Sequence, residues 1–292
     1  KEAKNSNLRW RPVGLGVMGL QDVFFKLGLA FDSAEACTVS ARIQEEIYFQ
    51  ALTTSCEIAE REGAHPSFAA TRAARGQLQF EHWGVTPHNL DRWDALRSRI
   101  TRVGLRNSLL IAIAPTATIA SIAGCYECIE PMVSNLFKRE TLSGDFLQLN
   151  TYLVEDLRSL GLWTQEIRDE IKRGNGSIQH IEAIPARMRH LYRTAWELSQ
   201  KELIDMAAAR SAFIDQSASL NLFLETPTVG KLSSMYMYAW KSGLKTTYYM
   251  RSRPATRIMQ TTTSPALAEK VFSEDEVIAC SLENPEYCEA CQ

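Results

Sequence analysis

The sequence predicts an α/β protein built on a parallel sheet or barrel. Short, continuously apolar runs of strand length, such as residues 108–115, alternate with longer segments whose apolar residues repeat at helical spacing. Strands of a parallel sheet are expected as such uninterrupted apolar runs, because helices cover both faces of the sheet. The chain has 292 residues, of which 45% are hydrophobic and 23% charged, as is usual for a globular protein with a sizeable core.

The expected elements can be placed in chain order. Residues 34–63 lack Pro, and lack Gly until Gly63, so they predict a long, largely buried helix that ends at this glycine. Residues 244–253 are rich in β-branched and aromatic residues and predict a strand. Further helices are expected near 89–104, within 143–161, at 164–174, as one long helix over 185–211, and at 226–243, and further strands at 108–115, 212–215 and 219–224.

The chain divides into two expected regions. Residues 1–255 carry the alternating pattern and form the predicted domain. Residues 256–292 are polar and aperiodic, which predicts a mobile tail.

Composition narrows the class of function. The formal net charge is −2, and Lys and Arg form no cluster, so no nucleic-acid partner is expected. There is no run of eighteen apolar residues and no apolar leader, so neither a membrane span nor secretion is expected, and the predicted location is the cytoplasm. Seven scattered cysteines are too few for a disulfide scaffold of this size.

A glycine motif near the start raises the question of a dinucleotide cofactor. Gly14-x-Gly16-x-x-Gly19 has the spacing of an NAD- or FAD-binding loop. That motif also needs an acidic residue at a strand end about twenty residues later. Asp32 lies instead within GLAFDSAEA, where no strand is expected. A Rossmann oxidoreductase is therefore one hypothesis, although a GxGxxG motif alone is a weak signal.

The stretch APTATIAS, residues 114–121, follows the expected strand at 108–115. A strand that ends at Pro115 and is followed by Thr116 and Thr118 predicts a helix start, where free N–H groups favour phosphate. Ordinary capping of the helix by a threonine explains the same pattern, and the local sequence favours it.

Two further residue pairs are candidates for redox chemistry. Tyr248 and Tyr249 are adjacent in an expected strand, so their rings should point to opposite faces, one buried and one exposed. A redox pair of stacked phenols is the functional alternative. The spacing of Cys288 and Cys291 in the tail suits a dithiol that closes and exchanges a disulfide. With Cys125 and Cys128 they also allow a zinc site, which the long separation of the two pairs disfavours.

Several stretches, in this order, resemble the large (alpha) subunit of class I ribonucleoside-diphosphate reductases. They are RPVGLGVMGLQDVF, LRNSLLIAIAPTATIASIAG, ECIEP, LSGDF, NGSIQ, LSQKELIDMAAARSAFIDQSASLN, GLKTTYYMRSRP and CSLENPEYCEACQ. The resemblance covers nearly the whole chain. It implies the second half of a ten-stranded α/β barrel, followed by a flexible C-terminal tail. In that fold the Gly-rich opening is a barrel strand and turn and binds no nucleotide.

The resemblance also assigns roles to residues. It implies that Thr116, Ala117, Thr118 and Ile119 hold the substrate diphosphate, although the family often has a hydroxyl residue where Ile119 stands. Tyr248 and Tyr249 match the pair that relays a radical to the active-site cysteine. Cys288 and Cys291 match the tail dithiol that re-reduces the active-site disulfide. Cys125 and Cys128 have no counterpart in the family pattern.

The resemblance places the remaining machinery outside this chain. It implies that the thiyl-radical cysteine, the active-site disulfide and the ATP/dNTP effector sites precede it, so the chain alone should be inactive. No cofactor is expected in the chain, because a metal cofactor in the small subunit generates the radical. The implied partners are that small subunit, the N-terminal half of the large subunit, thioredoxin or glutaredoxin, and a ribonucleoside diphosphate, within a homodimeric enzyme.

Other hypotheses remain open. A non-catalytic redox or zinc-binding module would use only the two CxxC pairs. A cobalamin-dependent reductase would need no tyrosine relay, so Tyr248 and Tyr249 argue against it.

Overall fold

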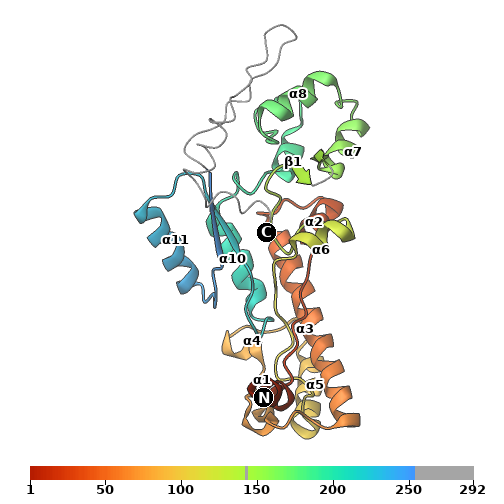
Figure 1. Ribbon diagram of the computed structural model, residues 1–292, viewed down its shortest axis with the longest axis vertical. Helices are drawn as coiled ribbons and strands as arrows, with labels where there is room; N and C mark the ends of the chain where they lie inside the picture. Colours follow the sequence, from red (N-terminus) through yellow and green to blue (C-terminus); the bar gives the residue numbers. More distant parts are fainter. Residues whose placement is uncertain (142–143, 254–292) are drawn as a thin grey trace. The chain divides into compact units, whose positions relative to one another are not determined.

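The computed structural model describes residues 1–141 and 144–253, which combine many helices with short strands (Figure 1). The helices are α1 (Glu2–Trp10), α2 (Leu20–Leu27), α3 (Ala34–Glu62), α4 (Gln79–His82), α5 (Leu90–Val103), α6 (Ala117–Ala123), α7 (Thr151–Ser159), α8 (Gln165–Arg173), α9 (Ala186–Leu191), α10 (Gln200–Ser211) and α11 (Val229–Lys241), with 3-10 turns at Phe68–Ala70 and Ala73–Arg75. The strands are β1 (Leu136–Thr141), β2 (Gly144–Leu149), β3 (Asn221–Leu224) and β4 (Tyr249–Ser252).

Extended segments from distant parts of the chain lie parallel to one another. Leu15 pairs with Ile111, and Ile113 pairs with Ala218, just before β3. β3 in turn pairs in parallel with β4. The order across this arrangement is therefore the glycine segment, the apolar run, the segment leading into β3, and β4. This confirms the predicted α/β class with parallel pairing.

α3 is the long helix expected over residues 34–63. The Ser33 side chain accepts a hydrogen bond from Ala36 N at 3.1 Å and caps its start, and Gly63, with a φ of 83°, follows its end. The helix packs against α5 and α10. The indole of Trp93, which is fully buried, lies in this core.

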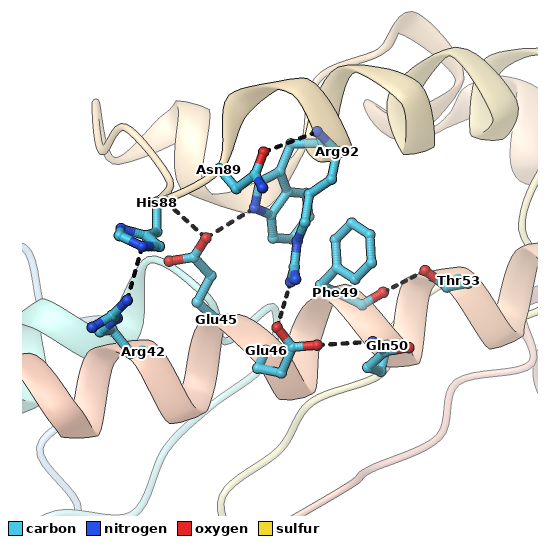
Figure 2. A network of polar contacts seen from close by, with 10 residues as sticks. Arg42, Glu45, Glu46, Phe49, Gln50, Thr53, His88, Asn89 and Arg92 are labelled. Carbon is cyan, nitrogen blue, oxygen red and sulfur yellow. Dashed lines mark hydrogen bonds and ion pairs between the residues drawn. The ribbon is translucent and has the colours of Figure 1, made fainter.

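A polar network joins α3 to the segment that leads into α5 (Figure 2). The buried Glu45 carboxylate accepts hydrogen bonds from His88 N at 2.9 Å and from the Trp93 indole Nε1 at 3.0 Å. Arg92 reaches Glu46 at 2.6 Å, and its guanidinium lies 3.8 Å from the centre of the Phe49 ring. The bond to Trp93 satisfies a donor that is cut off from water, so Glu45 is a structural anchor of α5.

The prediction of a single long helix over residues 185–211 is wrong. The structure has α9 and α10 instead, with an irregular segment between them. The amide of Asn135 donates to the Tyr192 carbonyl at 2.8 Å, and Ala195 N donates to the Met132 carbonyl at 2.8 Å. These bonds to a distant loop take backbone groups that a continuous helix would use.

Two other expectations are met only in part or fail, for local reasons. The helix expected within residues 143–161 is found as α7, but it begins only after Asn150, whose Oδ1 accepts from Tyr152 N, because Gly144–Leu149 pairs antiparallel with β1. A strand was expected over 212–215, but these residues form a turn, because Phe213 N and Ile214 N bond back to the end of α10.

Smaller helices complete the described part. α7 and α8 pack through apolar residues such as Leu157 and Ile171 into a second core, which also includes Phe25 of α2 and Met188 of α9. α1 was not expected from the sequence. Within residues 1–141 and 144–253, every helix is too short or too polar to cross a bilayer.

Candidate functional site

The glycine motif lies in the parallel arrangement and serves close packing. Leu15 N donates to the Leu110 carbonyl at 2.8 Å, and Ala112 N donates to the Leu15 carbonyl at 3.1 Å. A Cβ at Gly14 would lie 3.2 Å from the Cβ of Ala112, and one at Gly16 would lie 3.2 Å from the Ala112 carbonyl oxygen. Both distances are tighter than ordinary contacts, so glycine permits this approach.

The acidic residue that a dinucleotide site requires is engaged elsewhere. Asp32 lies in the turn between α2 and α3, away from any strand end. Its carboxylate pairs with Arg193 at 2.8 Å and with His190 at 3.3 Å. This placement removes the ribose-binding acid on which the Rossmann hypothesis depended.

The expected phosphate cradle lies where the apolar run turns into α6. Thr116 precedes the helix, but its hydroxyl does not cap it. Its Oγ1 accepts a hydrogen bond from Cys128 N at 2.7 Å, and the residue is buried. Ala117, Thr118 and Ile119 are exposed in the first turn, where backbone N–H groups have no acceptor within the helix. The local reading of Thr116 as a helix cap is therefore wrong.

The loop after α6 holds the first CxxC pair, and both thiols are free. Cys128 is buried, with a φ of 49°, and its Sγ lies 3.3 Å from Ser219 Oγ. Burial raises the pKa of both the Cys125 and the Cys128 thiol. A raised pKa favours the neutral thiol, which is the opposite of what a reactive dithiol needs.

The same loop buries a carboxyl group, that of Glu130. Only 6% of this residue is exposed. Its Oε1 accepts from Asn221 N at 3.2 Å, and its Oε2 has no hydrogen-bond partner within residues 1–141 and 144–253. Burial raises the pKa of Glu130 to about 7, against the opposing effect of the Arg210 guanidinium. Arg210 is itself buried, and its Nη1 lies 3.4 Å from Ser40 Oγ.

The tyrosine pair lies at the start of β4. The ring centroids of Tyr248 and Tyr249 are 4.5 Å apart and the rings are nearly perpendicular, at 88°. Tyr248 is 64% exposed and Tyr249 41%. The expectation that the rings point to opposite faces, one buried and one exposed, is wrong, because Tyr248 precedes the strand and its ring turns onto that of Tyr249.

Several bonds fix the strand that carries the pair. Tyr249 N donates to the Leu220 carbonyl at 3.0 Å, and Tyr249 pairs with Asn221 in register. Arg251 Nε donates to Asn221 Oδ1 at 2.9 Å. Upstream, Lys245 Nζ donates to the Ile214 carbonyl at 2.6 Å.

The cradle and the tyrosine pair thus lie on two different segments, and both segments pair with the same stretch of chain, which runs from Ala218 into β3. Residues 116–119 follow the segment that pairs with Ala218, and the tyrosines lie on the strand that pairs with β3. Cys288 and Cys291 lie outside the described residues. In the ranges 1–141 and 144–253, no group of three or more His, Cys, Asp or Glu side chains is arranged to hold a metal ion.

Sequence reasoning missed the polar residues that hold this arrangement. Glu130 and Asn221 received no role, although Glu130 belongs to the quoted stretch ECIEP. Asp215 was also missed, although its two carboxylate oxygens accept from Leu110 N at 2.9 Å and Ile111 N at 2.8 Å. For Glu130 and for Asp215, the available signal in the sequence was an acidic residue that stands between apolar residues.

Comparison with known proteins agrees with this arrangement. The family model of the ribonucleotide reductase barrel domain matches residues 1–250. A ribonucleoside-diphosphate reductase large subunit of Dictyostelium discoideum is 49% identical over 270 residues, which are 92% of this chain and 31% of that protein. One of Danio rerio is 44% identical over 304 residues, covering 100% of this chain and 38% of that protein.

A solved structure is similar as well. The Actinobacillus ureae class Id ribonucleotide reductase alpha subunit superposes with a TM-score of 0.67 at 28% identity, over 85% of this chain and 40% of that one. The chain therefore spans well under half of the length of these relatives. The family model alone covers most of the chain, and its description as a barrel domain fits the parallel strands seen here. The chain belongs to the ribonucleotide reductase barrel-domain family.

Proposed function

We propose that this chain is part of the large subunit of a ribonucleoside-diphosphate reductase, which converts ribonucleoside diphosphates to deoxyribonucleoside diphosphates for DNA synthesis. The observation that carries the proposal is that Thr116–Ile119 and Tyr248–Tyr249 are attached to the two segments that pair in parallel with the opposite sides of one stretch, which runs from Ala218 into β3. Substrate and radical must meet at one place, and this arrangement supplies a phosphate-binding turn and a phenol pair from one sheet.

The cradle would hold the diphosphate through backbone N–H groups. Ala117, Thr118 and Ile119 are exposed at the start of α6, and the Thr118 hydroxyl is available beside them. Anions are favoured at such a helix start because its N–H groups are unpaired and its dipole is positive. Thr116 would act differently, because its oxygen already accepts from Cys128 N. Its role would be to fix the turn.

The tyrosine pair would pass the radical inward from the small subunit. Each phenol gives up one electron and one proton when it is oxidised and recovers both when the next group is oxidised. Ring contact at 4.5 Å supports transfer between Tyr249 and Tyr248, and their exposure supports an approach from a partner subunit. The radical itself would come from the metal cofactor of that subunit.

The reduction consumes a dithiol. The substrate loses its 2′-hydroxyl as water, two thiols become one disulfide, and the product is the deoxyribonucleoside diphosphate. The tail thiols Cys288 and Cys291, which thioredoxin or glutaredoxin would reduce, would then re-reduce that disulfide. The thiyl-radical cysteine and the sites for ATP and dNTP effectors would be contributed by the preceding part of the large subunit. This chain together with that part is called the assembled large subunit below.

Reconstitution tests the proposal. The chain is incubated with small subunit, dithiothreitol and a ribonucleoside diphosphate, with and without the preceding part of the large subunit, and deoxyribonucleotide is measured. We expect product only with the preceding part. Exchange of Thr118 for Ala should raise KM, and exchange of both tail cysteines for Ser should abolish turnover with thioredoxin. Stoichiometric zinc and no activity in any mixture would favour the redox or zinc module instead.

A further inference from the structure

The parallel pairing beside the cradle is interrupted at Pro115. Ile113 N donates to the Ser217 carbonyl at 3.1 Å, and Ser219 N donates to the Ile113 carbonyl at 2.8 Å. In a regular parallel ladder, the next bond in this series would join Asn221 N to the carbonyl of residue 115. Instead the chain turns at Pro115 to form the cradle and α6. The first residue of β3 therefore needs another acceptor for its N–H group.

Glu130 supplies that acceptor. Its Oε1 accepts from Asn221 N at 3.2 Å, at the position that a strand carbonyl would occupy if the pairing continued. Both residues are almost fully buried, with 6% of Glu130 and 9% of Asn221 exposed. A buried N–H without an acceptor is destabilising, so the edge of β3 depends on this carboxyl group.

The effect of this bond extends to the tyrosine strand. The Asn221 side chain accepts from Arg251 Nε at 2.9 Å, and its backbone pairs in register with Tyr249. Glu130 therefore fixes the start of β3 on one edge, and β3 fixes β4 on the other.

The loop that carries Glu130 is also tied to the cradle. Cys128 lies two residues before Glu130 in the sequence, and its backbone N donates to Thr116 Oγ1 at 2.7 Å. Cys128 Sγ lies 3.3 Å from Ser219 Oγ, next to the last bond of the interrupted ladder. The buried residues at the end of one short loop thus contact both the turn into α6 and the edge of β3.

We propose that Glu130 is a positioning residue for the tyrosine strand: its carboxyl group replaces the carbonyl that the neighbouring strand withdraws at Pro115, and so holds β3, β4 and Tyr248–Tyr249 in register with the cradle. The hydrogen-bonding role follows from the geometry alone. Only its consequence for radical transfer rests on the function proposed above.

Hydrogen–deuterium exchange of the assembled large subunit tests the positioning role. Glu130→Leu removes the acceptor, Glu130→Gln keeps a carbonyl at the same place, and Glu127→Leu is the matched control at an exposed position of the same loop. We expect amides at 221 and 249–252 to exchange about tenfold faster or more in the Leu variant, with α5 unchanged. The Gln variant and the control should match the wild type. Equal exchange in Glu130→Leu and wild type, or equally fast exchange in Glu130→Gln, would overturn the proposal.

A second variant keeps the test decisive if Glu130→Leu does not fold. Asn221→Ala keeps the backbone N–H that donates to Glu130 and removes the side-chain oxygen that accepts from Arg251. We expect faster exchange at 251 and 252 and no change at the amide of position 221. Unchanged exchange throughout β4 would contradict the claim that β3 fixes the tyrosine strand.

Kinetics separates this inference from the function on which its consequence rests. In the assembled enzyme, Glu130→Leu should lower kcat at least about tenfold and leave KM for the ribonucleoside diphosphate within about twofold, with recovery in Glu130→Gln. A rise in KM with unchanged kcat would show a defect of the cradle and contradict the positioning role. If Tyr248→Phe retained full activity, the radical relay would fail, while the exchange data would still decide the role of Glu130.

Discussion

The buried carboxyl of Glu130 should make the stability of this protein depend on pH. Burial raises the pKa of Glu130 from its ordinary value of 4.5 to about 7 in the folded state. The folded protein therefore holds a proton that the unfolded chain releases between these two values. Protonation favours folding, so this contribution is fully present below about pH 4.5 and is lost as pH rises through about 7.

The size of the effect follows from the gap between the two pKa values. At about 1.4 kcal/mol for each pH unit, the free energy of unfolding should fall by about 3 kcal/mol between about pH 4.5 and 7. Only 6% of the residue is exposed, so solvent screens the effect little. The Gln side chain cannot titrate, so the Glu130→Gln variant should lose the part of the fall in the free energy of unfolding that this carboxyl causes. Below about pH 7 the wild-type carboxyl is mostly protonated and therefore neutral, as Gln is, so the two proteins differ chiefly in how the free energy of unfolding changes with pH, and that difference is the test.

Urea unfolding at pH 5, 6, 7 and 8 measures this difference. The wild type and Glu127→Gln, which alters an exposed carboxyl of the same loop, should show the same fall in stability. The stability of Glu130→Gln should fall less steeply, and the slope that remains includes the contribution of Asp215, whose pKa is also raised by burial. Parallel curves for Glu130→Gln and wild type would refute the claim that this group is buried and titrates near neutral pH.

Two further substitutions test two carboxylates that join distant segments, the half-buried Asp215 and the buried Glu45. Asp215→Asn removes one of two acceptors for the backbone N–H groups of the apolar run and should cost about 2 kcal/mol, measured by urea unfolding. An unchanged midpoint would contradict the bidentate bond. Glu45→Ala strands the buried indole N–H of Trp93 and should cost about 3 kcal/mol, whereas Glu46→Ala on the same helix, which breaks a more exposed ion pair, should cost less than about 1. Equal losses for these two variants would contradict the anchoring role of Glu45.

The parts of the fold that could be predicted depend on local pattern. The helix that begins after Ser33 was expected because its apolar residues repeat over many turns and Gly63 ends it. β4 was expected because β-branched and aromatic residues dominate its sequence. The long helix over 185–211 failed because Asn135 and Met132, far away in sequence, bond to the backbone between α9 and α10. Periodicity carries no information about such partners.

The candidate site was also predictable only where a local motif identifies the residues. Tyr248, Tyr249 and the cradle residues came from motifs that can be read along the chain. The role of Glu130 was not predictable, because its partner Asn221 is 91 residues away and the bond depends on the register of strands that break at Pro115. The contact between the tyrosine rings was also missed, since it depends on where β4 begins.

The relay of the radical through the tyrosine pair is the central claim and is tested by one comparison. Deoxyribonucleotide formation is measured in the assembled enzyme, with small subunit and dithiothreitol, for wild type, Tyr248→Phe and Tyr236→Phe. Tyr236 is a partly exposed tyrosine of α11 and serves as the matched control. We predict that Tyr248→Phe abolishes product, because Phe has no phenolic proton and electron to give up, while Tyr236→Phe keeps wild-type activity. Full activity of Tyr248→Phe would contradict the account.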